Sequence, residues 1–154
     1  YYIFLRFENW LSSNNISYQS EKSIDAIKHG GFFGQGIGEG ILKEKIPEAH
    51  TDYVLASISE EYGIIIIIFV LIIIFSLFMR VFAICQNEIS SFKKYTLIAL
   101  STLILSQIFI NVGVTINLLP STGMTFSFLS YGGSSILTSA FIMGIILALT
   151  KNKL

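Results

Sequence analysis

The residues best suited to chemistry lie together between positions 43 and 52, in the run KEKIPEAHTD. Three carboxylates occur there with two lysines and a histidine, and such carboxylates can act as a general base or bind a divalent cation. Asp52 is the most informative, because it precedes an apolar segment of membrane-spanning length, where an ionisable group is costly unless it is used. Two plainer interpretations stay open: a solvated charged rim, and Asp52 as the N-cap of the following helix.

Other motifs are weaker candidates. His50 does not indicate a metal site, because the second histidine, His29, is 21 residues away and ligand spacing is much shorter. Ser130 and Ser134 provide hydroxyls, but no G-x-S-x-G elbow surrounds them. The alternating glycines of 34–40 do not match the dinucleotide fingerprint G-x-G-x-x-G. They indicate either a flexible loop or a backbone that approaches a ligand or a membrane surface closely.

The composition indicates a membrane protein. Of the 154 residues, 53% are hydrophobic and only 13% are charged, whereas an ordinary soluble domain has about 25% charged residues. No Lys, Arg, Asp or Glu occurs in the 56 residues from 95 to 150, which predicts two spans joined by an uncharged turn. The zero net charge excludes a generally basic nucleic-acid binder, and the single cysteine excludes an intramolecular disulfide framework.

We therefore expect an all-α, polytopic helical membrane protein in which a large extracytoplasmic loop precedes three transmembrane helices. Gln107 and Asn111 lie four residues apart on one face of the second of these helices, and polar residues in lipid usually bind neighbouring helices. The expected order is a loop over 1–53, a helix over 54–79, a cytoplasmic loop over 80–94, a helix over 95–119, an outer turn over 120–130, a helix over 131–150 and a cytoplasmic tail over 151–154.

The distribution of charge predicts the orientation. Arg80, Lys93 and Lys94 flank the connection between the first two helices, and two lysines follow the third. By the positive-inside rule, these places face the cytoplasm. Residues 1–61, with five cations and nine anions, and the turn between the second and third helices then face outward.

Two long motifs resemble the SEDS family (shape, elongation, division and sporulation) of polytopic membrane proteins. The run IPEAHTDYVLASISEEYG over 46–63 resembles the family signature LPEAHTDFIFAVIGEELG, and the run INVGVTINLLPSTGMTFSFLSYGGSS over 110–135 is similar to a second one. The likeness covers nearly the whole chain and is greater to the division member than to the elongation member. It implies the C-terminal part of a multi-pass protein of the bacterial cytoplasmic membrane at the division septum, a part that we expect to be inactive alone.

The resemblance also implies an activity. The family comprises peptidoglycan glycosyltransferases, which polymerise lipid II into glycan strands outside the membrane and release undecaprenyl pyrophosphate. Asp52 occupies the family's essential acidic position and is the expected catalytic residue, a base for the 4-hydroxyl of a GlcNAc. The expected substrate-binding residues, which would orient the sugars, neutralise the pyrophosphate or shape the outer cavity, are Arg6, Lys43, Glu44, Lys45, Glu48, His50, Ser130 and Ser134.

The implied partners are lipid II, a class B penicillin-binding protein transpeptidase and other divisome membrane proteins, with no nucleic acid. No residue is assigned as a metal ligand, although a divalent cation, Mg²⁺ or Mn²⁺, held against the pyrophosphate by Glu44 and Glu48 is an open possibility. Three alternatives to the division glycosyltransferase also stay open: a lipid II flippase, an elongation glycosyltransferase, and a non-catalytic divisome scaffold.

Overall fold

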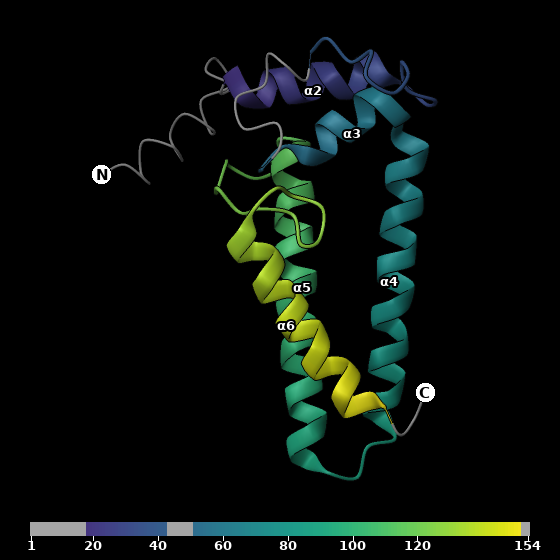
Figure 1. Cartoon of the computed structure of the whole chain (residues 1–154), viewed down its shortest axis with the longest axis vertical. Coiled ribbons are helices and arrows are strands. Elements are labelled where there is room, and N and C mark those ends of the chain that lie inside the picture. Colours follow the sequence, from purple (N-terminus) through teal and green to yellow (C-terminus); the bar gives the residue numbers. More distant parts are fainter. Residues whose placement is uncertain (1–17, 43–50, 152–154) are drawn as a thin grey trace, which may run out of the picture.

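The computed structural model describes residues 18–42 and 51–151. Within these ranges the chain is helical, with no strand, so the all-α prediction is confirmed (Figure 1). The helices are α2 (Tyr18–Gly30), α3 (Val54–Tyr62), α4 (Ile64–Gln86), α5 (Ser91–Thr115) and α6 (Gly133–Thr150).

Three of these helices are long and apolar enough to cross a membrane. Helices α4, α5 and α6 have 23, 25 and 18 residues, and at 1.5 Å per residue the longest is about 37 Å long. They run up and down along the long axis of the molecule, so the ends of α4 and α6 lie together at the end opposite α2 (Figure 1). This arrangement is the one that the expected orientation requires.

Helices α2 and α3 lie across the other end of the bundle (Figure 1). Glu21 lies in the first turn of α2, and Lys28 and His29 lie in its last turn, so these charges complement the helix dipole. One face of α2 is buried, with Ser23 and Ala26 fully covered. The Ser23 hydroxyl donates to the Thr115 carbonyl at the end of α5, with an O–O distance of 2.8 Å. Within the described part of the predicted outer loop, residues 18–30 thus form a helix that packs against the end of the bundle, which α2 and α3 together cap.

Gly63 separates α3 from α4. Its φ of 82° lies in the left-handed region that side chains disfavour, and a Cβ there would overlap the Phe32 carbonyl. The segment expected as one helix over 54–79 is therefore two helices, of which the second continues to Gln86.

The other helix bounds also differ from the expected ones. The connection between α4 and α5 is short, because the helices run past Arg80, Lys93 and Lys94. Long cationic side chains can extend toward the interface from within a helix, so charges mark the membrane boundary without ending the helix. Cys85, expected in a cytoplasmic loop, is buried within α4.

The core joins the bundle to its cap, while the sides of the bundle are apolar and exposed. A buried cluster runs from α3 into the bundle through Leu55, Phe78 and Ile104. In contrast, α4 exposes large side chains along its length, including Phe69 at 60% and Phe75 at 60%. Exposed apolar surface of this extent is expected of a helix that faces lipid or another helix.

Candidate functional site

Asp52 lies in the turn that leads into α3, at the capped end of the bundle. The N-cap residue of α3 is Tyr53, whose side chain makes no cap hydrogen bond. Asp52 thus directly precedes the assigned N-cap position. Tyr53 is only 1% exposed, whereas Asp52 is half-buried. The turn is thus anchored by a buried ring directly beside a carboxylate that solvent can reach.

Asn111 holds the backbone of Asp52. This asparagine is 1% exposed, and its amide nitrogen donates to the Asp52 carbonyl at 2.9 Å and to the Met124 carbonyl at 2.8 Å. One side chain of α5 therefore joins the turn before α3 to the turn between α5 and α6. Hydrogen bonds to buried carbonyls stabilise the fold mainly because a buried carbonyl without a hydrogen-bond donor destabilises it.

Ser130 provides a second link one residue earlier. Its hydroxyl donates to the Thr51 carbonyl with an O–O distance of 2.5 Å and accepts from the backbone N–H of Phe126 at 2.7 Å. The same turn is also held to α5 by the Ser127 hydroxyl, which donates to Gln107 at 2.9 Å. Two successive carbonyls, those of Thr51 and Asp52, are thus fixed by side chains that come from elsewhere in the chain.

The carboxylate of Asp52 faces the turn between α5 and α6. A Cβ built on Gly123 would lie 3.8 Å from its Oδ2 atom, so Gly123 lies beside the carboxylate. Asp52 also precedes the N-terminus of α3, where the helix dipole favours a negative charge. A half-buried carboxylate on a rigid turn is chemically suited to accept a proton from a bound hydroxyl.

A second acidic residue, Glu60, is completely buried at the other end of α3. Its Oε1 atom accepts from the backbone N–H of Leu42 at 2.9 Å and lies 3.2 Å from Nδ1 of His29. Glu60 therefore ties α3 both to α2 and to the loop that leads toward residue 43. A buried carboxylate needs such partners, because its desolvation is expensive.

Of the predicted substrate-binding residues, only the two serines lie in the described ranges, and their burial differs. Ser130 is buried and hydrogen-bonded as described, whereas Ser134 is exposed in the first turn of α6. Among the described residues, no three His, Cys, Asp or Glu side chains gather closely enough to hold a metal ion. The predicted substrate-binding residues outside the described ranges are Arg6, Lys43, Glu44, Lys45, Glu48 and His50.

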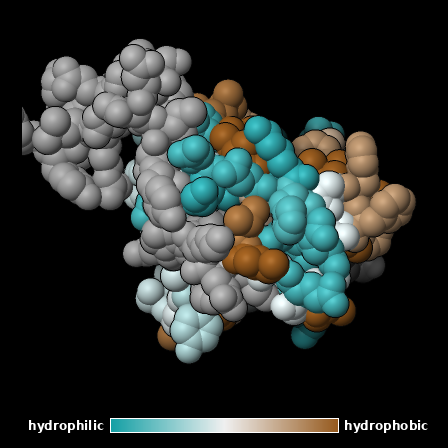
Figure 2. All heavy atoms as spheres, turned by 90° about the horizontal axis from the view of Figure 1, so that it is seen from above, coloured by the Kyte–Doolittle hydropathy of each residue, from teal (hydrophilic) through white to brown (hydrophobic). Residues whose placement is uncertain are grey.

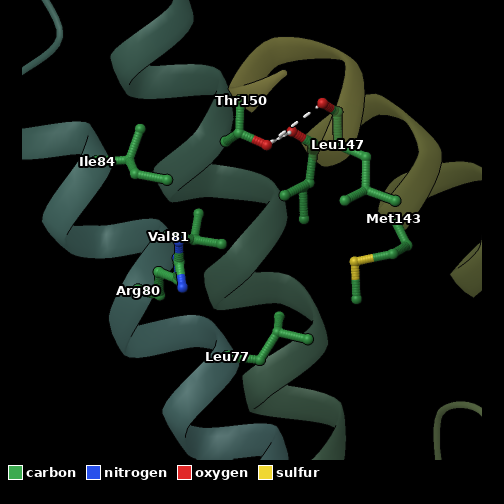
Figure 3. A pocket seen from close by; sticks show the side chains of 8 residues that line it. Leu77, Arg80, Val81, Ile84, Met143, Leu147 and Thr150 are labelled. Carbon is green, nitrogen blue, oxygen red and sulfur yellow. Dashed lines mark hydrogen bonds between the residues drawn. The ribbon is translucent and has the colours of Figure 1, made fainter. Parts of the chain in front are cut away.

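Apolar grooves lie along the sides of the bundle, away from Asp52. One of about 760 Å³ lies between α4 and α5, and another of about 310 Å³ lies between the inner ends of α4 and α6. Figure 3 shows the second groove, in which Arg80 and Thr150 are the polar residues among aliphatic ones. The Thr150 hydroxyl donates to the Ile146 carbonyl of its own helix. Neither groove is lined by a predicted site residue.

Sequence reasoning missed the roles of two residues. Glu60 is not among the predicted site residues, yet a glutamate between apolar residues of the same helix is a signal of a buried, partnered charge. Gly123 is likewise not among the predicted site residues. No local pattern indicates that it faces Asp52, because the two residues are 71 positions apart.

Comparison with known proteins gives consistent matches. The family profile described as cell cycle protein, which covers FtsW, RodA and SpoVE, matches residues 2–154. The chain is 34% identical over 99% of its length to the probable peptidoglycan glycosyltransferase FtsW of Caulobacter vibrioides, of which it covers 39%. It is similar to the proteins of that name from Lactococcus lactis (41% identity; 88% of this chain and 34% of the relative) and Bacillus subtilis (39%; 87% and 34%). The chain thus spans little more than a third of the length of these relatives.

Proposed function

The chain belongs to the cell cycle protein family of FtsW, RodA and SpoVE, and we propose that the protein containing it is a division-type peptidoglycan glycosyltransferase. Its relatives are named as probable enzymes of this kind. The observation that carries the proposal within the chain is the Asp52 turn. A half-buried carboxylate lies at the capped end of the helical bundle, and Asn111 and Ser130 hold its backbone.

The reaction joins two lipid-linked disaccharides. The 4-hydroxyl of an acceptor GlcNAc attacks the anomeric carbon of the donor, a glycosidic C–O bond forms, and the bond from that carbon to undecaprenyl pyrophosphate breaks. Asp52 accepts the hydroxyl proton as the new bond forms. The turn directly precedes α3, and α3 leads through Gly63 into the membrane-compatible helix α4, so Asp52 can reach a sugar whose lipid tail stays in the bilayer.

The remaining roles, in binding the pyrophosphate and the sugars, belong to Arg6 and to residues shortly before Asp52 in the sequence. Lys43, Lys45 and Arg6 would neutralise the pyrophosphate, since cations form strong charge-assisted hydrogen bonds with phosphate. Glu44, Glu48 and His50 would orient the sugars. If Mg²⁺ or Mn²⁺ takes part, the oxygen ligands of these glutamates suit it. Ser130 acts through the backbone of Thr51.

The setting proposed for this activity follows from the helices and the relatives. Three membrane-compatible helices indicate a multi-pass protein, which we place in the cytoplasmic membrane with α2 and α3 outside. The division septum is the proposed location, with a class B penicillin-binding protein and other divisome membrane proteins as partners. The flippase alternative requires a polar path through the bilayer. Of the polar side chains of α5, Gln107 and Asn111 are engaged in holding the turn before α6, which leaves a few hydroxyls for such a path.

The test is Asp52→Asn in the full-length protein, assayed with purified lipid II. The change keeps the shape of the side chain and removes the base, so no glycan polymer is expected. Asp25→Asn is the matched control, because Asp25 lies on α2 in a partly exposed ion pair with Lys22 and this variant should retain wild-type polymerisation. Wild-type polymer from Asp52→Asn would contradict the proposal. Full complementation of a depletion strain by Asp52→Ala would favour the scaffold alternative.

A further inference from the structure

The loop that follows α2, up to residue 42, carries an unusual number of exposed apolar side chains. Phe32 is 71% exposed and Phe33 is 86% exposed, while Ile37 and Ile41 are 77% and 62% exposed. Four large apolar residues within ten positions form a surface that water disfavours. We call residues 32–41 the apolar loop; the proposed chemistry at Asp52 does not use it.

The backbone around the apolar loop is held in a defined position. The N–H of Ile64, the first residue of α4, donates to the Gly31 carbonyl at 3.0 Å, and the N–H of Gln35 donates to the Glu60 carbonyl at 2.9 Å. Gly34 has a φ of 80°, and a Cβ at this position would overlap the backbone at the end of α3. The glycines thus allow a close backbone contact between the loop and the junction of α3 with α4.

This contact fixes the loop at the level where α4 begins. The first turns of α4 are themselves apolar and exposed, with Ile65 at 45%, Ile66 at 41% and Phe69 at 60%. In Figure 1 the loop after α2 lies beside the upper end of α4. Figure 2, a view of this end, shows a band of hydrophilic side chains with hydrophobic ones beside it and along the right-hand edge. The apolar loop therefore continues the lipid-compatible surface of α4 outward.

We propose that the apolar loop inserts into the outer leaflet of the bilayer, with Phe32, Phe33 and Ile37 among the lipid headgroups and the upper acyl chains. Aromatic side chains are favoured at this depth, and apolar residues on an interfacial segment bind membranes in proportion to the area they bury. The occupant is lipid, because Gly31, directly before the loop, is bonded to the first residue of a helix long and apolar enough to span the bilayer.

The insertion has a consequence that rests on the proposed function. The apolar loop is bonded to α3 through the carbonyl of Glu60, and α3 begins two residues after Asp52. Lipid contact at the loop therefore sets the height of the Asp52 turn above the bilayer, at the level of the pyrophosphate of a membrane-held substrate.

A fluorophore that responds to its surroundings tests the insertion in the full-length protein reconstituted in vesicles, with native cysteines replaced. The fluorophore is attached to the new cysteine of the variant Phe33→Cys. Two further variants are labelled in the same way: Glu39→Cys, an exposed polar control in the same loop, and Ile65→Cys, a reference on α4. Lipids brominated in the upper acyl chain should quench the label at positions 33 and 65 at least twofold more strongly than at position 39. Aqueous iodide should give the reverse order.

Two results would overturn the insertion. Equal quenching by iodide at positions 33 and 39 would mean that the loop faces water. Protection of the label at position 33 from both quenchers would mean that another protein surface covers it. Neither quenching measurement depends on glycan polymerisation. The insertion proposal can therefore be refuted while the catalytic role of Asp52 holds, and the catalytic role can be refuted while the insertion holds.

Discussion

Replacing Asn111 with aspartate tests whether its amide positions Asp52. The substitution keeps the size and shape of the side chain but removes both N–H donors, which reach the carbonyls of Asp52 and Met124 at 2.9 and 2.8 Å. It also points a carboxylate oxygen at these two carbonyls. The turn before α3 and the turn before α6 should then separate, because like partial charges repel each other.

The magnitude follows from the number of bonds lost. Leaving a buried carbonyl unsatisfied costs about 1–3 kcal/mol. Asn111 is 1% exposed, so losing its bonds to two carbonyls should cost about 2–6 kcal/mol of stability in total. A displacement of the Asp52 turn by about 1 Å should also lower polymerisation about 100-fold per folded molecule. The loss of rate should therefore exceed what the loss of folded protein explains.

Thermal unfolding of the full-length protein in detergent measures the stability, and polymerisation of purified lipid II measures the rate. Ser106→Ala is the matched control on the same helix, because its exposed hydroxyl donates only to the Leu103 carbonyl within α5. That variant should match the wild type in both assays. If Asn111→Asp unfolds earlier but polymerises at the wild-type rate per folded molecule, the amide stabilises the fold without positioning Asp52, and the reasoning is wrong.

Two further predictions concern glycine and serine pairs that differ in their surroundings. Gly34→Ala should cost about 3 kcal/mol or more, because its Cβ would overlap backbone at the end of α3 in a left-handed conformation. Gly31→Ala, where open space surrounds an equally left-handed residue, should cost about 1 kcal/mol; equal melting temperatures of the two variants would contradict the close contact. Ser130→Ala should cost about 2 kcal/mol through its two hydrogen bonds, whereas Ser134→Ala on the exposed start of α6 should change the melting temperature little. A larger loss for the second serine would refute the assigned roles.

The helical class and the three long helices could be predicted from the sequence. A run of 56 residues without a charged side chain admits few structures other than membrane helices, because lipid cannot satisfy exposed backbone groups. The family could also be recognised, because its two motifs are long and occur in order. Asp52 was identified in the same way, from a motif that is continuous in the sequence. Its catalytic role remains a prediction.

The helix bounds could be predicted only approximately. Arg80, Lys93 and Lys94 suggested where the membrane ends, but helices α4 and α5 run past them. Hydrogen bonding continues along a helix whether its side chains face lipid or water. The division at Gly63 was also not predicted, because glycine occurs both inside helices and between them, and here contact with the Phe32 carbonyl decides the conformation.

What the sequence by itself determined is thus local: the length of the apolar segments, the distribution of charged residues along the chain, and the motif that contains Asp52. Only the tertiary structure decided how that residue is held. Asn111 reaches the Asp52 carbonyl across 59 positions, and Ser130 reaches the Thr51 carbonyl across 79. Gln107 and Asn111 were expected to bind neighbouring helices, and instead both hold the turn before α6. The physical reason is that a buried polar group takes whichever partner the packing brings within about 3 Å, and no sequence spacing encodes that distance.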